Sequence, residues 1–426
     1  MNKTSKIKEI YDLTRLNNGL RVVSENIPHF RSISLGFWIA RGSRDELKNE
    51  GGITHLIEHL LFKGTKRRNA KDIAKEFDEI GAEFNAFTSK EYFCLYSKFL
   101  DEHLTKVLDI LSDMIMNSRF SNKDVNLEKN VVLEEIKSRN DNPHLIVTDL
   151  FYRSLFGDHP LSRPVLGFHS VVKSLTRDYV SNYYKNFISS NNTVIASVGN
   201  IKHSFLLSEI NKYLKIPANL VQKRKKIIAE PRKKIALKKR DIEQTNICYG
   251  TTGLDRNNED RFILSVLLNI LGGSMSSRLF QEIREKRGLA YSVYSYHSTF
   301  MDTGSIYIYA GTSVQNVEKV IKVIKKEIYN LKKAKIKQDE LDRSKSNIKG
   351  NIVLGLEETN TRMIRIGKSI LCRNKILSID EILKKIDNVS LDDLVRISNK
   401  FFDEDRMVLA AVGPITKKQL EKAYYV

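Results

Sequence analysis

The chain has 426 residues, of which 41% are hydrophobic, and a formal net charge of +20 at pH 7. This length allows two or more domains with full hydrophobic cores, and the composition is typical of a soluble globular protein. Since no apolar run approaches the roughly 20 residues that a membrane-spanning helix needs, we expect no membrane span. The cysteines Cys94, Cys248 and Cys372 lie far apart, which argues against a disulfide framework or a cysteine zinc cluster and fits a reducing cytoplasm.

Basic residues are spread over nearly the whole chain and are accompanied by abundant Ile and Asn. Two basic clusters, at 223–226 and 232–234, would indicate nucleic-acid binding if they lay together on one face. The even spread is more typical of a genome-wide compositional bias. We therefore interpret the charge as a solvated basic surface, which can favour acidic partners, and we expect no nucleic-acid partner.

In chain order, a predicted strand from Ser32 to Ala40 precedes a helix that carries His-Leu-Ile-Glu-His at 55–59. Because positions i and i+4 of a helix lie one above the other, His55 and His59 can bind one metal ion together. Glu58 lies beside them, close enough to act on a metal-bound water. Two imidazoles and one oxygen ligand are the set that catalytic zinc uses, here in inverted zincin order. The alternative is a helix whose two histidines are buried in the core or hydrogen-bonded.

The region from Asn122 to Ser138 has a helical pattern and contains three glutamates that could supply the oxygen ligand. Glu128 and Glu135 fall on one helical face, whereas Glu134 points elsewhere. Carboxylates on a partly apolar face are costly unless they meet a cation or hydrogen-bond donors. We therefore predict Glu135 as the ligand, with Glu128 supporting it or a histidine. The alternative is an ordinary charged helix surface.

The chain contains an internal repeat, because residues 171–201 and 385–415 align without a gap at a shift of 214. Each segment has a capping residue, an amphipathic helix and a buried-type strand that ends in Val-Gly. The halves also begin alike, with a second strand at Thr245–Thr251 and a second helix at Arg261–Leu271. In that helix, the positions equivalent to His55, Glu58 and His59 are occupied by Leu264, Leu267 and Leu268.

The sequence therefore predicts two homologous α+β domains with one metal site. We predict an N-terminal zinc-binding domain over residues 1–215 and a C-terminal domain without metal ligands over residues 237–426. Between them, residues 216–236 contain two prolines and a dense Lys/Arg stretch, which indicates a basic linker.

These features resemble the pitrilysin-type inverzincin zinc metallopeptidases, with Glu135 following His59 by 76 positions. The segments GGITHLIEHLLFKGT, GAEFNAFTSKEY, HPLSRPVLG and LFQEIREKRGLAYSVYS are similar to the compact processing-peptidase branch. That branch includes the catalytic subunit of the mitochondrial processing peptidase and its bacterial relatives. The resemblance runs from about Thr14 to the C-terminus. It implies two domains, each a mainly antiparallel sheet with helices, that form a clam around one zinc site, and it implies a homodimer.

The resemblance also implies roles for the residues of the metal site. His55, His59 and Glu135 would bind one Zn²⁺ per chain. Glu58 would be the general base that activates the bound water, which agrees with the ordinary chemistry of zinc and a nearby carboxylate. Glu128 matches the supporting acidic residue of the family.

Other matching positions would contact the substrate. Arg284 and Tyr291, in REKRGLAY, match an Arg/Tyr pair that reaches the substrate near the metal. Without the resemblance, both would be read as surface or packing residues. Asn85 and Ala86 lie in a predicted strand, 84–88, that resembles the edge strand onto which an extended peptide adds. The alternative there is a simple sheet strand.

We therefore expect a zinc-dependent endopeptidase that hydrolyses peptides or unfolded polypeptide segments bound as an added β-strand. The alternative is a non-catalytic family member that acts as a scaffold or core subunit of a complex. That alternative predicts the loss of one or more residues of the metal site, and none is lost.

Overall fold

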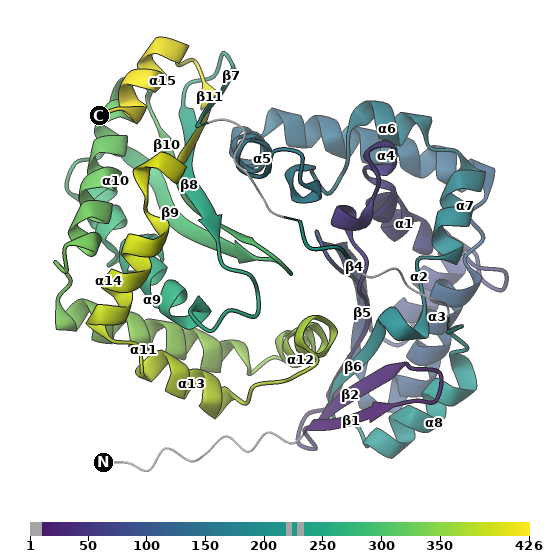
Figure 1. Cartoon of the computed structure of the whole chain (residues 1–426). Helices are drawn as coiled ribbons and strands as arrows, with labels where there is room; N and C mark the ends of the chain where they lie inside the picture. The colour runs from purple at the N-terminus through teal and green to yellow at the C-terminus, as the bar shows by residue number, and fades with distance from the viewer. Residues whose placement is uncertain (1–10, 219–223, 228–233) are drawn as a thin grey trace, which may run out of the picture. The chain divides into compact units, whose positions relative to one another are not determined.

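The structure of this chain is a computed structural model. It describes residues 11–218, 224–227 and 234–426. The chain forms two compact units, each built around its own sheet (Figure 1). Each unit also has its own hydrophobic core. Neither unit follows one continuous stretch of chain. Unit 1 comprises Met1–Lys137, Pro164–Arg224 and Leu354–Ile379, and unit 2 comprises Ser138–Arg163, Lys225–Val353 and Asp380–Val426.

The strands of unit 1 are β1 (Tyr11–Arg15), β2 (Arg21–Asn26), β3 (Ser32–Ile39), β4 (Glu83–Thr88), β5 (Phe93–Leu100) and β6 (Thr193–Gly199). They form one six-stranded sheet in the order β1-β2-β6-β3-β5-β4. Only β2 and β6 run parallel, and every other neighbouring pair is antiparallel. The mainly antiparallel sheet predicted for this half is therefore confirmed, and among the described residues β1 and β4 lie at its edges.

Helices cover both faces of the unit 1 sheet. Because successive strand residues point to opposite faces, Phe37 of β3 packs in a core with Leu56 and Leu111, while Trp38 faces the other way. There the Trp38 indole N–H donates to the sulfur of Met363 at 3.3 Å. The helices of unit 1 are α1 (Ile53–Leu61), α2 (Ala70–Asp78), α3 (Leu104–Asn117), most of α4 (Asn122–Asp141), α6 (His169–Ser174), α7 (Arg177–Lys185), α8 (His203–Tyr213) and α12 (Thr359–Arg373).

Unit 2 repeats this plan. Its strands are β7 (Ile235–Lys239), β8 (Thr245–Gly253), β9 (Ala290–Thr299), β10 (Gly304–Thr312) and β11 (Val408–Gly413). The sheet order β7-β11-β8-β10-β9 matches β2-β6-β3-β5-β4 of unit 1 strand by strand, including the one parallel pair. Its helices are α5 (Pro143–Phe156), α9 (Arg261–Gly272), a π-helical turn (Phe280–Glu285), α10 (Val317–Lys332), α11 (Gln338–Gly355), α13 (Ile379–Asp387), α14 (Leu391–Phe401) and α15 (Lys417–Tyr424).

The internal repeat is confirmed in the helix and strand that close each half. Thr176 caps α7 and Ser390 caps α14, each by accepting a hydrogen bond from a backbone amide three residues later. A fully buried strand follows each helix, β6 in unit 1 and β11 in unit 2. The repeated segment therefore builds the same helix–strand element twice.

The compact units differ from the sequential division into 1–215 and 237–426 at two helices. Helix α5, from the first half, packs on β11, β8 and β7 of unit 2. Helix α12, from the second half, packs on β6 and β3 of unit 1. Each sheet has two apolar faces, and each of these helices helps to cover the second one. The two halves therefore exchange a helix, which a boundary drawn along the sequence does not capture.

The predicted linker at 216–236 lies partly outside the described residues, at 219–223 and 228–233. In its described part, the Arg224 guanidinium forms an ion pair with the Asp45 carboxylate at 2.6 Å within unit 1. Across the described residues, no helix combines the length and the apolarity that crossing a membrane requires.

Candidate metal centre and active site

Helix α1 presents the His-Leu-Ile-Glu-His motif because its apolar residues face the core. Leu56, Ile57 and Leu60 are buried, so the motif's polar side chains lie on the other side of the helix. The helix begins after Gly52, whose φ of +98° favours glycine. The Glu46 carboxylate accepts hydrogen bonds from the amides of Gly52 and Thr54 at 2.9 and 3.0 Å. A negative charge at this end stabilises the helix that carries the site.

Three side chains meet on this surface with the donor set of a zinc site. His55 Nε2 lies 3.7 Å from Glu135 Oε2, and His59 Nε2 lies 3.5 Å from Glu135 Oε1. The two imidazole rings are 4.7 Å apart between centroids. Ligand atoms about 2.1 Å from a tetrahedral ion lie about 3.4 Å from one another, so these separations fit one Zn²⁺. Among the described residues, this is the one such group of three or more His, Cys, Asp or Glu side chains.

The electrostatics of the site suit metal binding and proton transfer. Burial, with a smaller contribution from His59, lowers the pKa of His55 to about 4. Near pH 7 this imidazole is therefore neutral, which is the form that binds metal. Burial also raises the pKa of Glu58, while hydrogen bonds from Thr88 act in the opposite direction. A carboxylate with a raised pKa is a better proton acceptor.

A buried carboxylate contacts one of the two predicted histidine ligands. Glu128 has only 3% of its side chain exposed, and its Oε2 lies 3.1 Å from His59 Nδ1. An acceptor at Nδ1 favours the tautomer whose Nε2 lone pair is free for a metal. Lys63 Nζ lies 2.8 Å from the other Glu128 oxygen and compensates its charge. The sequence allows Glu128 to support either Glu135 or a histidine, and the structure places it against His59.

Two contacts at this site were missed by sequence reasoning. Lys63 is one, although its position four residues after His59 was a usable signal. The other is Thr88, the last residue of β4, whose hydroxyl donates to Glu58 Oε2 at 2.5 Å. Thr88 lies 30 residues from Glu58, and nothing in the local pattern indicates that they touch.

The predicted substrate strand is an edge strand. Within the described residues of unit 1, β4 pairs with β5 alone. Asn85 is exposed on this strand, and its side-chain oxygen accepts a hydrogen bond from the Ala86 amide at 2.8 Å. The Ala86 side chain is buried. An open strand edge is a template for an added strand, so the geometry suits an extended peptide.

Arg284 and Tyr291 lie in unit 2 and contact each other. The Arg284 guanidinium lies 4.7 Å from the ring centroid of Tyr291 and 4.7 Å from that of Phe280. Tyr291 is 77% exposed, so its hydroxyl is accessible. The stack brings together two residues that are seven apart in sequence.

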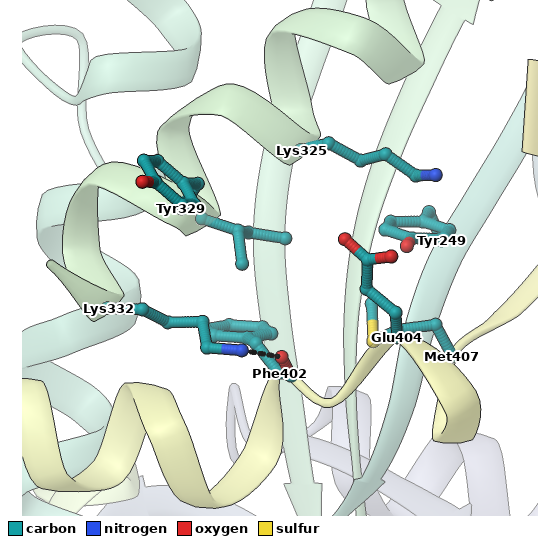
Figure 2. Close-up of a pocket in the computed structure, with 8 residues that line it drawn as sticks. Tyr249, Lys325, Tyr329, Lys332, Phe402, Glu404 and Met407 are labelled. Atoms are coloured by element: carbon teal, nitrogen blue, oxygen red, sulfur yellow. Dashed lines mark hydrogen bonds between the residues drawn. The ribbon is translucent and has the colours of Figure 1, made fainter. Parts of the chain in front are cut away.

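Unit 2 also contains a small pocket that holds none of the predicted site residues (Figure 2). It lies between α10 and the segment after α14, and both signs of charge face it from Lys325, Lys332 and Glu404. However, Lys332 Nζ donates to the Phe402 carbonyl at 3.0 Å, and Lys325 Nζ donates to the Tyr424 carbonyl at 2.5 Å. The lysines thus bind backbone carbonyls of unit 2, which indicates a structural role.

Known proteins match the chain over nearly its whole length. A family model described as insulinase, peptidase family M16, matches residues 21–168, and one described as the peptidase M16 inactive domain matches residues 174–348. The uncharacterized zinc protease YmxG of Bacillus subtilis is 41% identical over 402 residues, which cover 93% of this chain and 97% of that protein.

Solved structures share the fold at lower identity. A protease from Helicobacter pylori is 23% identical, with a TM-score of 0.88 over 95% of this chain and 100% of its own. A chain of complex III2 from Candida albicans is 21% identical, with a TM-score of 0.83 over 97% of this chain and 99% of its own. At these identities the likeness shows a common fold and nothing about activity.

Proposed function

Because the chain belongs to peptidase family M16, the insulinase family, we propose that it is a zinc-dependent endopeptidase. Its substrates are peptides or unfolded polypeptide segments. The observation that carries the proposal is the convergence of His55, His59 and Glu135, with the Glu58 carboxylate on the same surface of α1. The relatives named zinc proteases support the same activity.

His55, His59 and Glu135 would hold one Zn²⁺. When bound, the ion supplies a Lewis acid that polarises a carbonyl oxygen and lowers the pKa of water. Glu58 accepts the proton of the attacking water and delivers it to the departing amine nitrogen. Glu128, which is buried against His59, keeps that histidine in the ligating tautomer.

The substrate is proposed to lie extended along the open edge of β4, where backbone hydrogen bonds hold it with little regard to its sequence. Asn85 and Ala86 would contact it there. By resemblance to the family, we also assign Arg284 and Tyr291 to the substrate: arginine can hold a peptide carbonyl, and a tyrosine hydroxyl can donate to a developing oxyanion.

Glu58→Gln tests the proposal, because glutamine keeps the shape of the side chain but cannot accept a proton. We expect about one zinc ion per chain in both the parent and the variant, by metal analysis, and cleavage of unstructured peptides by the parent alone. Equal cleavage by the two proteins would contradict the assignment of the base. Full zinc content without cleavage by the parent would favour the non-catalytic alternative, a scaffold or core subunit.

We further propose that the protein is a cytoplasmic homodimer. The resemblance supports the pairing, and the free cysteines, with Cys94 and Cys248 buried, fit a reducing compartment. Light scattering should give twice the chain mass of 49.1 kDa. A mass equal to that of one chain would contradict the dimer.

A further inference from the structure

The carboxylate of Glu58 is held from outside its own helix. Thr88 Oγ1 donates to Glu58 Oε2 at 2.5 Å, and Thr88 ends the edge strand β4. A hydrogen bond to a charged acceptor is stronger and more directional than a neutral one. One oxygen of the base therefore has a fixed position relative to the strand, not only relative to α1.

The end of β4 that carries Thr88 is itself firmly held. Thr88 is paired in register with Phe93 of β5, whose side chain is fully buried and packs against Phe187. The turn between the strands is closed by the Ser89 amide, which donates to the Tyr92 carbonyl at 2.8 Å. The hydroxyl that holds Glu58 is thus placed by a short, well-anchored hairpin.

Glu58 needs such a restraint for physical reasons. Its side chain has three rotatable bonds, it is partly buried, and the nearby Glu135 carboxylate repels it. A free carboxylate in that position would turn away from Glu135 or take up a proton. A group that transfers a proton must lie within hydrogen-bond reach of its partner, and small displacements of such groups are costly in rate.

We propose that Thr88 is a positioning residue that ties the general base to the strand edge on which the peptide adds. The added peptide and the Glu58 carboxylate then take their positions from one rigid element, the β4–β5 hairpin. This inference rests on the proposed function, because it gives Glu58 the role of base and β4 the role of substrate strand.

Two variants of Thr88 distinguish the effect of the hydroxyl group on catalysis from the effect of the side-chain shape. Thr88→Val removes the donor and keeps a β-branched residue suited to a strand. We expect it to lower kcat about tenfold, the effect of one lost hydrogen bond to a charged group, with KM and zinc content within about twofold of the parent. Thr88→Ser keeps the donor and should restore kcat to within about twofold of the parent.

Ser97→Ala is the matched control in the same hairpin. Ser97 Oγ donates to the Glu83 carbonyl at 2.7 Å and does not touch Glu58. Its loss removes a hydrogen bond between β5 and β4 but leaves the Thr88–Glu58 hydrogen bond in place, so kcat should stay near the parent value. An unchanged kcat in T88V, an equal loss in T88S, or an equal loss in S97A would each overturn the proposed role of Thr88.

Thermal unfolding tests the Thr88–Glu58 contact without any need for cleavage. T88V should lower the Tm by about 2 °C when Glu58 is present and leave it unchanged in an E58M background, which has no acceptor. Equal losses in the two backgrounds would contradict the inference. A parent that cleaves no peptide yet shows this coupling would contradict the proposed function and leave the Thr88–Glu58 contact supported.

Discussion

Helices α1 and α9 occupy the same place in the two units but carry different chemistry. Both follow a central strand of the sheet, β3 or β8, and both bury an apolar surface against their own core. In α9, Leu264, Leu267 and Leu268 are buried in that core. At the positions that the sequence alignment pairs with these leucines, α1 carries His55, Glu58 and His59, which stay partly accessible beside Glu135. The comparison teaches that the fold needs the helix, whereas the metal site needs only a few substitutions on one of its faces.

The largest difference between the two helices should appear when His59 and Leu268, which the sequence alignment pairs, are each replaced by alanine. His59→Ala removes a metal ligand, so zinc content should fall to near zero and cleavage should be lost while the fold persists. Leu268→Ala leaves a cavity in the core of unit 2, so the free energy of unfolding should fall by about 2–5 kcal/mol with zinc content retained. Metal analysis and denaturant unfolding measure both effects. A folded L268A protein without zinc would contradict the assignment.

A second difference between the helices is that α1 carries a partly buried histidine, His55, whose pKa lies well below its usual value. His55 has a pKa of about 4 in the metal-free fold, against an ordinary value of 6.5. Between these values the unfolded chain binds more protons than the folded one, so this histidine makes stability rise with pH from about 4 to 6.5 and level off above.

Unfolding of the metal-free parent and of His55→Gln over this pH range checks that expectation. Between pH 6.5 and pH 4, the free energy of unfolding of the parent should fall by on the order of 2 kcal/mol more than that of the variant. Parallel curves for the two proteins would show that His55 is not the group responsible. Leu264, its equivalent in α9, contributes no such dependence because it does not titrate.

The smallest expected effect concerns the residues that support the ligands. Lys63→Met leaves the buried Glu128 carboxylate without its cation, which weakens the hold on His59. We expect zinc affinity to fall about tenfold, at the lower end of the effects seen for such outer contacts. Competition with a chelator measures this change. Lys63→Arg, which keeps the charge, should stay close to the parent, and an equal loss in both variants would point to packing instead.

Much of the fold could be predicted because its signals are local. The observed strand at Ser32–Ile39 and helix at Arg261–Gly272 lie within two residues of their predicted ends. Their apolar periods act over a few residues and do not depend on distant partners. The repeat at 171–201 and 385–415 was visible because both copies must build the same helix and buried strand.

The exchange of α5 and α12 could not be predicted in this way. An amphipathic helix shows in its sequence that one face is buried, but not which sheet will bury it. The same limit applies to Thr88. The residue pattern at 84–88 indicates a strand, but it does not show that the Thr88 hydroxyl contacts the Glu58 carboxylate.

The sequence by itself determined the candidate pair of metal ligands, because the pitch of a helix alone places His55 and His59 on one face. It also indicated Glu135 and Glu128 as candidates, since two carboxylates on one face of α4 need a partner. Only the tertiary structure decided which carboxylate faces which histidine atom, and that Lys63 and Thr88 complete the surroundings. Those contacts join α1 to α4 and to β4, so they depend on how the elements pack rather than on residue spacing.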